Sequence, residues 1–226
     1  MKMVKFKNIA LVLFAVLLIK TPAYSYFYAK YKAGNNSNDY ITVTGDSYAG
    51  WFASYEAHRD YNMYVYADAG KSTEENLKVM EDAIDSESNV ILISIGVNDH
   101  NKRIPLDEFK YRMSYLIETC ALKNKKVLLH TYMDYILPDI AGTVVSTNVS
   151  TATGSNLRVA DNLRPQYKVT DYDDELRELG RKYKNAFYID MSDYNYGLFL
   201  QDDKIHYNKL FYDALYERVK MAIMLL

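Results

Sequence analysis

The chain has 226 residues, of which 49% are hydrophobic and 25% are charged, and its formal net charge at pH 7 is −2. These values are typical of a globular protein with a substantial core, and they exclude collagen, coiled coil and disorder as the main architecture. The near-neutral charge gives no basic field for binding nucleic acid. The single cysteine, Cys120, cannot form an internal disulfide, and four histidines leave few ligands for a structural zinc site. We therefore expect one folded domain that uses no metal or other cofactor.

The first 25 residues have the pattern of a targeting segment. Three lysines within the first seven residues precede an uninterrupted apolar run at Ile9–Ile19, and the small-x-small pattern Ala23–Ser25 follows. These features predict a cleaved signal peptide. An uncleaved anchor is equally compatible with the sequence if the span extends from Ile9 to Ala29 and Lys20 reaches the membrane interface.

The same pattern predicts the domain organisation and the location of the protein. We expect a signal peptide or membrane anchor at residues 1–25, a linker at 26–39 and a catalytic domain at 40–226. Lysines before the apolar run predict export with the C-terminus outside. The protein is then secreted, or anchored to the outer face of the cytoplasmic membrane through its N-terminal segment alone. Nothing in the sequence specifies an oligomeric state.

The rest of the chain alternates between strand and helix patterns. Val90–Ile95 is a continuous run of apolar, mostly β-branched residues, as expected for a strand covered on both faces. Ser72-x-x-Glu75 is a capping-box pattern, and an apolar stripe after Pro105 predicts a helix with Cys120 in the core. The predicted strands are Tyr40–Thr44, Met63–Ala67, Val90–Ile95, Val127–Thr131 and Phe187–Asp190, and two further predicted helices are Asp171–Tyr183 and Tyr207–Leu226.

This alternation predicts a doubly wound parallel sheet. In such sheets, ligands bind beyond the carboxyl ends of the strands. A long connection at Pro138–Thr170 has no helical period, and loops of that length are functional lids or mobile insertions.

Four short motifs follow successive elements of the predicted sheet. Gly45–Ser47 follows the first strand, so Ser47 lies at the start of the next helix, where a developing oxyanion is stabilised. Gly70 follows the second strand, Gly96–Asp99 follows the third, and Asp203–His206 precedes the last helix. Each motif alone is also typical of a turn or a helix cap. Together they are expected to converge on one edge of the sheet.

The order Gly-Asp-Ser, Gly, Gly-x-Asn-Asp and Asp-x-x-His resembles the SGNH hydrolases, also called the GDSL esterase/lipase superfamily. The resemblance extends from about Tyr40 to the C-terminus. It implies an α/β, three-layer, flavodoxin-like fold, with a five-stranded parallel sheet and helices on both faces. Many relatives have glycine after the final aspartate, where this chain has Lys204.

The resemblance also implies a role for each matching residue. Ser47 is the expected nucleophile, His206 the general base, and Asp203 the acid that orients the imidazole. The Ser47 N–H, the Gly70 N–H and the Asn98 side chain are the expected oxyanion hole. Asp202 adjoins Asp203, so the choice between them rests on spacing alone.

Neighbouring residues have simpler interpretations. Asp46 either ties loops together or is an exposed turn acid. Three aromatic residues after Ser47 are expected in the core rather than in a sugar platform, and one histidine, His100, is a weak candidate for lining the cleft. The aromatic residues are Trp51, Phe52 and Tyr55; the other histidines are His58, expected at the surface, and His130, expected to be buried in a strand.

The sequence therefore predicts an exported serine esterase for short acyl esters, with acetylated polysaccharide as the expected substrate. One alternative is an O-acyltransferase, in which a sugar hydroxyl replaces water in attacking the acyl-enzyme. No residue separates these two activities. The other alternative is a catalytically inactive surface-binding domain. The presence of all five expected site residues argues against it, because a binding module need not keep them.

Overall fold

The computed structural model describes residues 26–31, 40–56, 59–130, 169–192, 199, 201 and 206–226. They form a six-stranded sheet in the order β1-β3-β2-β4-β5-β6. Five strands are parallel, as predicted, and β1 pairs antiparallel with β3. The strands are β1 (Tyr26–Tyr31), β2 (Tyr40–Gly45), β3 (Asn62–Asp68), β4 (Val90–Ser94), β5 (Lys126–His130) and β6 (Ala186–Tyr188).

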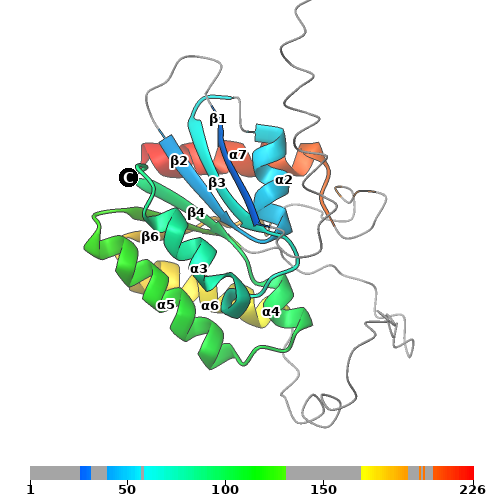
Figure 1. Cartoon of the computed structure of the whole chain (residues 1–226), viewed down its shortest axis with the longest axis vertical. Helices are drawn as coiled ribbons and strands as arrows, with labels where there is room; N and C mark the ends of the chain where they lie inside the picture. Colours follow the sequence, from blue (N-terminus) through cyan, green and yellow to red (C-terminus); the bar gives the residue numbers. More distant parts are fainter. Residues whose placement is uncertain are drawn as a thin grey trace, which may run out of the picture.

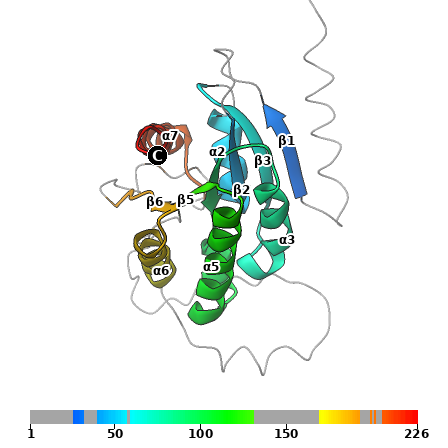
Figure 2. The same cartoon turned by 90° about the vertical axis from the view of Figure 1, so that its left-hand side faces the viewer.

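Helices cover both faces of the sheet, which gives the predicted three layers (Figure 1, Figure 2). Helices α2 and α7 pack together on one face, and α3, α5 and α6 pack on the other. The short helix α4 follows the end of β4. The helices are α2 (Ser47–Glu56), α3 (Thr73–Ile84), α4 (Val97–Asn101), α5 (Leu106–Leu122), α6 (Val169–Lys182) and α7 (Lys209–Met224).

Consecutive side chains of the central strands point into opposite layers. Ile91 and Ile93 pack in the cluster with α3, α5 and α6, whereas Leu92 packs in the cluster with α2 and α7. All three side chains are buried. A strand covered on both faces needs apolar side chains at every position, which explains the continuous apolar run that predicted β4.

The predicted helical stripe on α5 is confirmed. Phe109, Met113, Ile117 and Cys120 have no exposed surface. Burial raises the pKa of the Cys120 thiol to about 12, so the thiol stays protonated at neutral pH. Cys120 is therefore a core residue, as the spacing predicts.

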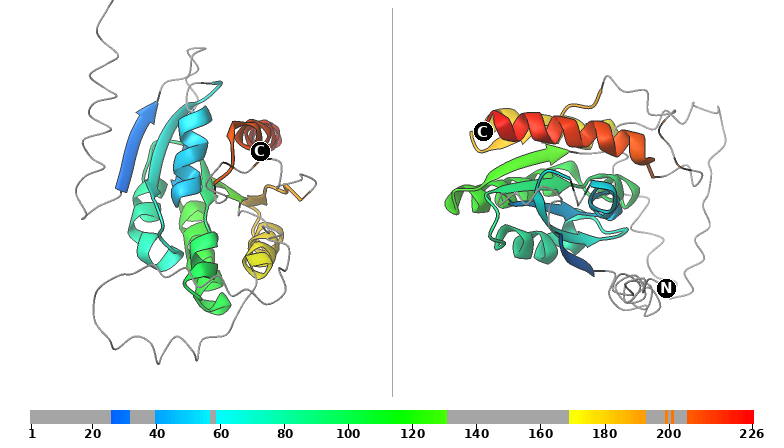
Figure 3. Two further views of the ribbon diagram at one scale, coloured as in Figure 1. Left: turned by 90° about the vertical axis from the view of Figure 1, so that its right-hand side faces the viewer. Right: turned by 90° about the horizontal axis from the view of Figure 1, so that it is seen from above.

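The edge strand β1 corrects the predicted linker. Residues 26–31 pair with β3, and Tyr26 lies opposite Asp68. Figure 2 and the left view of Figure 3 show β1 as the outermost strand. Because residues paired in this sheet cannot also cross a bilayer, the anchor to Ala29 considered above conflicts with the structure, and any span must end by Ser25.

Several predicted features lie outside the described residues. They are the N-terminal segment at 1–25, the remainder of the linker at 32–39, His58, and most of the connection Pro138–Thr170. Within the ranges that the structure describes, no helix combines the length and the hydropathy needed to cross a membrane.

Candidate active site

Ser47 is the first residue of α2, just beyond the carboxyl end of β2. Gly45 adopts a φ of +141°, and a Cβ atom there would lie 1.9 Å from the Ser94 carbonyl oxygen on β4. Only glycine tolerates this conformation and this close approach. The tight turn places the start of α2 at the sheet edge, where the first-turn N–H groups have no partner within the helix. Ser47 is partly exposed there.

His206 lies beside Ser47, although the two lie 159 positions apart in the sequence. The distance from His206 Nε2 to Ser47 Oγ is 3.1 Å, which is within reach for a general base and its nucleophile. The imidazole ring lies 5.2 Å from the Tyr48 ring and 5.7 Å from the Trp51 ring, measured between centroids. The Gln201 N–H donates to the His206 carbonyl at 2.8 Å. Ring contacts and a backbone hydrogen bond therefore hold the imidazole toward the serine.

The acid of the expected triad lies outside the described residues. Asp203, its neighbour Asp202 and Lys204 all fall within the segment 202–205. The assignment of Asp203 stays a prediction, based on its three-residue offset from His206.

Asn98 and Asp46 contact each other beside the nucleophile. Asn98 Nδ2 donates to Asp46 Oδ2 at 2.9 Å, and Asp46 Oδ1 accepts the Tyr48 N–H at 3.0 Å. The primary amide of asparagine carries two N–H groups, and this contact uses one of them. It also fixes which end of the Asn98 amide carries the donors. The role of Asn98 in the oxyanion hole stays a prediction.

The sequence left two interpretations of Asp46, and the structure favours the one in which it ties loops together. Asp46 has no exposed surface. Burial raises the pKa of its carboxyl to about 7, although the hydrogen bonds from Tyr48 and Asn98 act in the opposite direction. An exposed turn acid would have neither the burial nor these two partners.

Gly70 lies two residues beyond the end of β3. Its φ is +73°, in the left-handed region that favours glycine, and no described atom lies within 4 Å of the position of an added Cβ. Its carbonyl oxygen accepts a hydrogen bond from Lys102 Nζ at 2.8 Å. The backbone conformation therefore favours glycine here, whereas crowding does not.

Two buried polar contacts that the sequence did not predict join the site loops. Thr73, at the start of α3, donates to Asp99 through its N–H at 3.0 Å and its hydroxyl at 2.5 Å. Asn76 Nδ2 donates to the Gly45 carbonyl at 2.6 Å. Burial raises the pKa of the Asp99 carboxyl to about 6. The sequence did contain a signal for the Asn76 contact. Asn76 shares the buried face of α3 with Met80, and a polar residue on an apolar stripe needs a hydrogen-bond partner.

The three aromatic residues after Ser47 do not share one environment. Phe52 is fully buried, as expected. Trp51 and Tyr55 contact the core but are partly exposed, and their rings stack at a centroid distance of 5.7 Å. All three therefore pack in or against the core, as expected, and the Trp51 ring also lies 5.7 Å from the His206 ring, measured between centroids.

The two remaining described histidines, His100 and His130, contact the rings of Tyr172 and Phe211. His130 is buried at the carboxyl end of β5, as expected, and burial lowers the pKa of its imidazole to about 3. His100, on α4, packs edge-on against Tyr172 at 6.3 Å between ring centroids. Among the described residues, no three His, Cys, Asp or Glu side chains lie close enough together to hold a metal ion.

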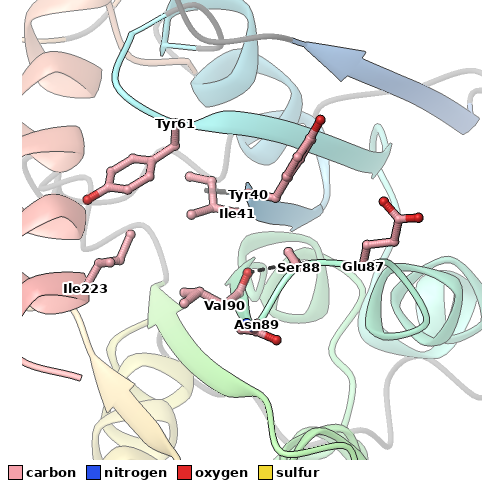
Figure 4. Close-up of a pocket in the computed structure, with 8 residues that line it drawn as sticks. All are labelled: Tyr40, Ile41, Tyr61, Glu87, Ser88, Asn89, Val90 and Ile223. Atoms are coloured by element: carbon pink, nitrogen blue, oxygen red, sulfur yellow. Dashed lines mark hydrogen bonds between the residues drawn. The ribbon is translucent and has the colours of Figure 1, made fainter. Parts of the chain in front are cut away.

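A cavity of about 410 Å³ lies at the opposite edge of the sheet (Figure 4). Tyr40 lines the cavity and lies five positions before Gly45 on β2, which amounts to ~17 Å of strand. The cavity is therefore separate from the serine and histidine. Its lining residues are Tyr40, Ile41, Tyr61, Glu87, Ser88, Asn89, Val90 and Ile223.

No family model and no curated protein sequence matches the chain. Solved structures do resemble it. A protein from Desulfitobacterium hafniense assigned to the G-D-S-L lipolytic family has 12% identity and a TM-score of 0.51, covering 80% of this chain and 98% of its own. The acetyl xylan esterase Axe2 from Geobacillus stearothermophilus has 13% identity and a TM-score of 0.52, covering 79% and 91%. The salicylyl-acyltransferase SsfX3 from a tetracycline biosynthetic pathway has 16% identity and a TM-score of 0.56, covering 83% and 55%.

At these identities the likeness concerns the fold. It agrees with the parallel sheet and the layers of helices. The resemblance inferred from the motifs is therefore confirmed at that level, and the chain has the fold of the SGNH hydrolases.

Proposed function

We propose that the protein is an exported serine esterase that cleaves short acyl esters, with O-acetyl groups on a polysaccharide as its substrate. The observation that carries this proposal is the 3.1 Å separation between Ser47 Oγ and His206 Nε2 at the carboxyl edge of the sheet. A serine hydroxyl is a weak nucleophile on its own and needs an adjacent base. Neutral imidazole is a suitable base near physiological pH.

The reaction proceeds through an acyl-serine. His206 takes the hydroxyl proton as Ser47 Oγ attacks the ester carbonyl carbon, and the carbonyl oxygen becomes an oxyanion. The N–H groups of Ser47 and Gly70 and the Asn98 amide stabilise that charge. The intermediate collapses, and the alcohol leaves with the proton from His206. Water then repeats the sequence on the acyl-serine, which releases the carboxylic acid and restores the hydroxyl of Ser47.

The stacked pair Trp51–Tyr55 supports a carbohydrate as the alcohol part of the substrate. Both rings are partly exposed, and the Trp51 ring lies next to His206, which protonates the leaving alcohol in this mechanism. An aromatic face beside that position provides apolar contact for a sugar ring, and tyrosine adds a polar group. The similarity of fold to an acetyl xylan esterase is consistent with this substrate class.

The alternative activity is acyl transfer to a sugar hydroxyl in place of water. The fold is shared with the salicylyl-acyltransferase, and the same serine and histidine serve both reactions. The two are distinguished by the fate of the acyl group. An esterase releases free acid at the same rate in the presence of a competing sugar acceptor, whereas a transferase forms a new sugar ester.

Covalent labelling tests the proposed nucleophile. An organophosphonate is expected to label the wild type, and p-nitrophenyl esters of graded acyl length are expected to define the acyl preference. Ser47→Ala is expected to abolish both labelling and hydrolysis. Ser54→Ala is the matched control, because Ser54 is an exposed serine on the same helix whose hydroxyl donates to the Trp51 carbonyl. Labelling of Ser47→Ala at the wild-type level would refute the assignment.

A further inference from the structure

The two segments that carry Gly70 and Asn98 follow different strands of the sheet. Gly70 lies between β3 and α3, whereas Asn98 lies in α4, which follows β4 (Figure 1). In the proposed mechanism both residues donate to one oxyanion, and such donors are effective only when they are held in place before the reaction begins. Contacts that join the two segments therefore bear on the proposed activity.

The backbone at Gly70 has a freedom that packing does not remove. A Cβ atom added to Gly70 would have no described atom within 4 Å, and its φ of +73° is one that glycine adopts at no steric cost. Glycine is also the residue type with the greatest conformational freedom. The direction of the Gly70 N–H, the expected donor, therefore depends on hydrogen bonds that hold the peptide groups of this turn.

Lys102 is hydrogen-bonded to both segments. Its Nζ donates to the Gly70 carbonyl oxygen at 2.8 Å, although the two residues lie 32 positions apart. Its backbone N–H donates to the Asn98 carbonyl oxygen at 3.0 Å, at the end of α4. One residue thus connects the turn at Gly70 to the helix that carries Asn98.

Glu75 holds the ammonium group of Lys102 in this position. Lys102 Nζ forms an ion pair with Glu75 Oε2, which also accepts the Ser72 N–H at 3.0 Å. Burial acts to raise the pKa of the Glu75 carboxyl, but the hydrogen bonds from Lys102 and Ser72 outweigh burial and lower this pKa below its ordinary value. Glu75 is therefore ionised at neutral pH, and the ammonium group contacts both its carboxylate and the Gly70 carbonyl.

We propose that Lys102 is a positioning residue for the oxyanion hole, and that its ammonium group holds the turn at Gly70 in register with Asn98. The inference rests on the proposed esterase function. Lys102 acts through Gly70 and does not itself bind the ester. The competing interpretation is an ion pair that serves stability alone, because the Lys102 and Glu75 side chains are 38% and 40% exposed and exposed pairs contribute little. Such a pair would leave kcat unchanged.

Removal and chemical restoration of the ammonium group distinguish the two roles. In Lys102→Cys we expect kcat for p-nitrophenyl acetate to fall about five- to tenfold, with KM changed less than about twofold. KM stays similar because acylation and deacylation both form an oxyanion, so both steps slow. Alkylation of the new thiol with 2-bromoethylamine rebuilds a side chain of the length of lysine with a terminal ammonium, and it should restore most of kcat. Alkylation with 1-iodopropane gives the same length without the charge and should not.

Two controls support the comparison. The native thiol, Cys120, is buried, and burial raises its pKa to about 12, so the wild type should keep its activity after either reagent. Lys78→Cys removes an exposed lysine of α3 that pairs with Asp82 at 2.7 Å, and its kcat should match that of the wild type before and after each treatment. Urea unfolding of each form shows whether a substitution also changes stability.

Three results would overturn the positioning role. They are an unchanged kcat in Lys102→Cys, equal restoration of kcat by the two reagents, and a loss of kcat that 2-bromoethylamine does not relieve. Equal restoration would mean that the length of the side chain, and not its ammonium group, is responsible. If the wild type hydrolyses no p-nitrophenyl ester and an organophosphonate does not label Ser47, the esterase function itself is refuted, and this inference with it.

Discussion

Asp46 and Asn98 lie 52 positions apart in the sequence and contact each other next to the expected nucleophile, where Asn98 Nδ2 donates to Asp46 Oδ2 at 2.9 Å. The other oxygen of Asp46 holds the Tyr48 N–H in the first turn of α2. One buried carboxyl group thus links the turn that presents Ser47 to the amide expected to stabilise the oxyanion. Asp46 is a positioning residue in this arrangement, because it acts on the reaction through Asn98.

A double-mutant cycle tests this link. Asn98→Ala is expected to lower kcat by ~10²–10³, the usual loss for one oxyanion donor. Asp46→Asn is expected to lower kcat by roughly tenfold, because one hydrogen bond to the amide is lost. In the Asn98→Ala background, Asp46→Asn should have little further effect on kcat, since the group that it positions is absent. Independent, multiplying effects on kcat would contradict the positioning role.

The raised pKa of Asp46 predicts how stability depends on pH. The carboxyl has a pKa of about 7 in the folded protein and about 3.9 in an unfolded chain. Between these values the folded state binds the proton and the unfolded state does not, so this group's contribution to stability falls as pH rises from about 4 to about 7.

Asp46→Asn removes this titration. The free energy of unfolding of wild type and variant, measured in urea at several pH values, should differ in a pH-dependent way. As pH rises toward 7, the free energy of unfolding of the wild type should fall relative to that of Asp46→Asn. His130, whose pKa is lowered by burial, contributes in the opposite direction but is present in both proteins and cancels in the comparison. A constant difference between pH 4 and 8 would contradict the raised pKa of Asp46.

Local patterns were sufficient to predict the central strands, the α5 stripe and the position of Ser47. The continuous apolar run of β4 reflects burial on both faces, and the helical spacing up to Cys120 reflects burial on one face. The proximity of Ser47 and His206 followed from the parallel topology, because strand ends and the loop before the last helix meet at one edge.

The features that were missed depend on contacts between distant segments. Strand β1 adjoins the apolar N-terminal run in sequence, and its pairing depends on the free edge of β3, which no local pattern encodes. The Thr73–Asp99 contact joins residues 26 positions apart. For Trp51 and Tyr55, helical spacing of i, i+4 places them on one face, whereas Phe52 points elsewhere. This spacing was visible in the sequence, but it does not determine how much of either ring is exposed.

Ser47 and His206 are expected to behave as one functional unit. Ser47→Ala and His206→Ala should each remove nearly all hydrolysis of p-nitrophenyl acetate, and the double variant should be little worse than either. The reason is that the serine is a poor nucleophile without its base, and the base has no role without the serine. Single-turnover and steady-state rates of the three variants check this. Additive losses in the double variant would show that the two groups act in separate steps.

Gly45 and Gly70 form a matched pair for testing the turn geometry. Gly45→Ala places a Cβ against the Ser94 carbonyl at a positive φ, so a loss of roughly 3 kcal/mol or more in the free energy of unfolding is expected. In Gly70→Ala, the added Cβ has no described atom within 4 Å. Only the left-handed backbone conformation lowers the free energy of unfolding, by about 1 kcal/mol. Urea unfolding of both variants measures the difference. Equal losses would contradict the close contact between β2 and β4 at this turn.

The last prediction concerns the acid expected to orient His206. A carboxylate on the second ring nitrogen fixes the tautomer and compensates the imidazolium, so Asp203→Asn should lower kcat while retaining more activity than Ser47→Ala or His206→Ala. Asp202→Asn is the matched control, because it makes the same chemical change one position away and should be mild. Steady-state kinetics of both variants with one soluble ester are sufficient. If Asp202→Asn is the severe change and Asp203→Asn the mild one, the Asp-x-x-His register is wrong, and the acid must be reassigned to Asp202.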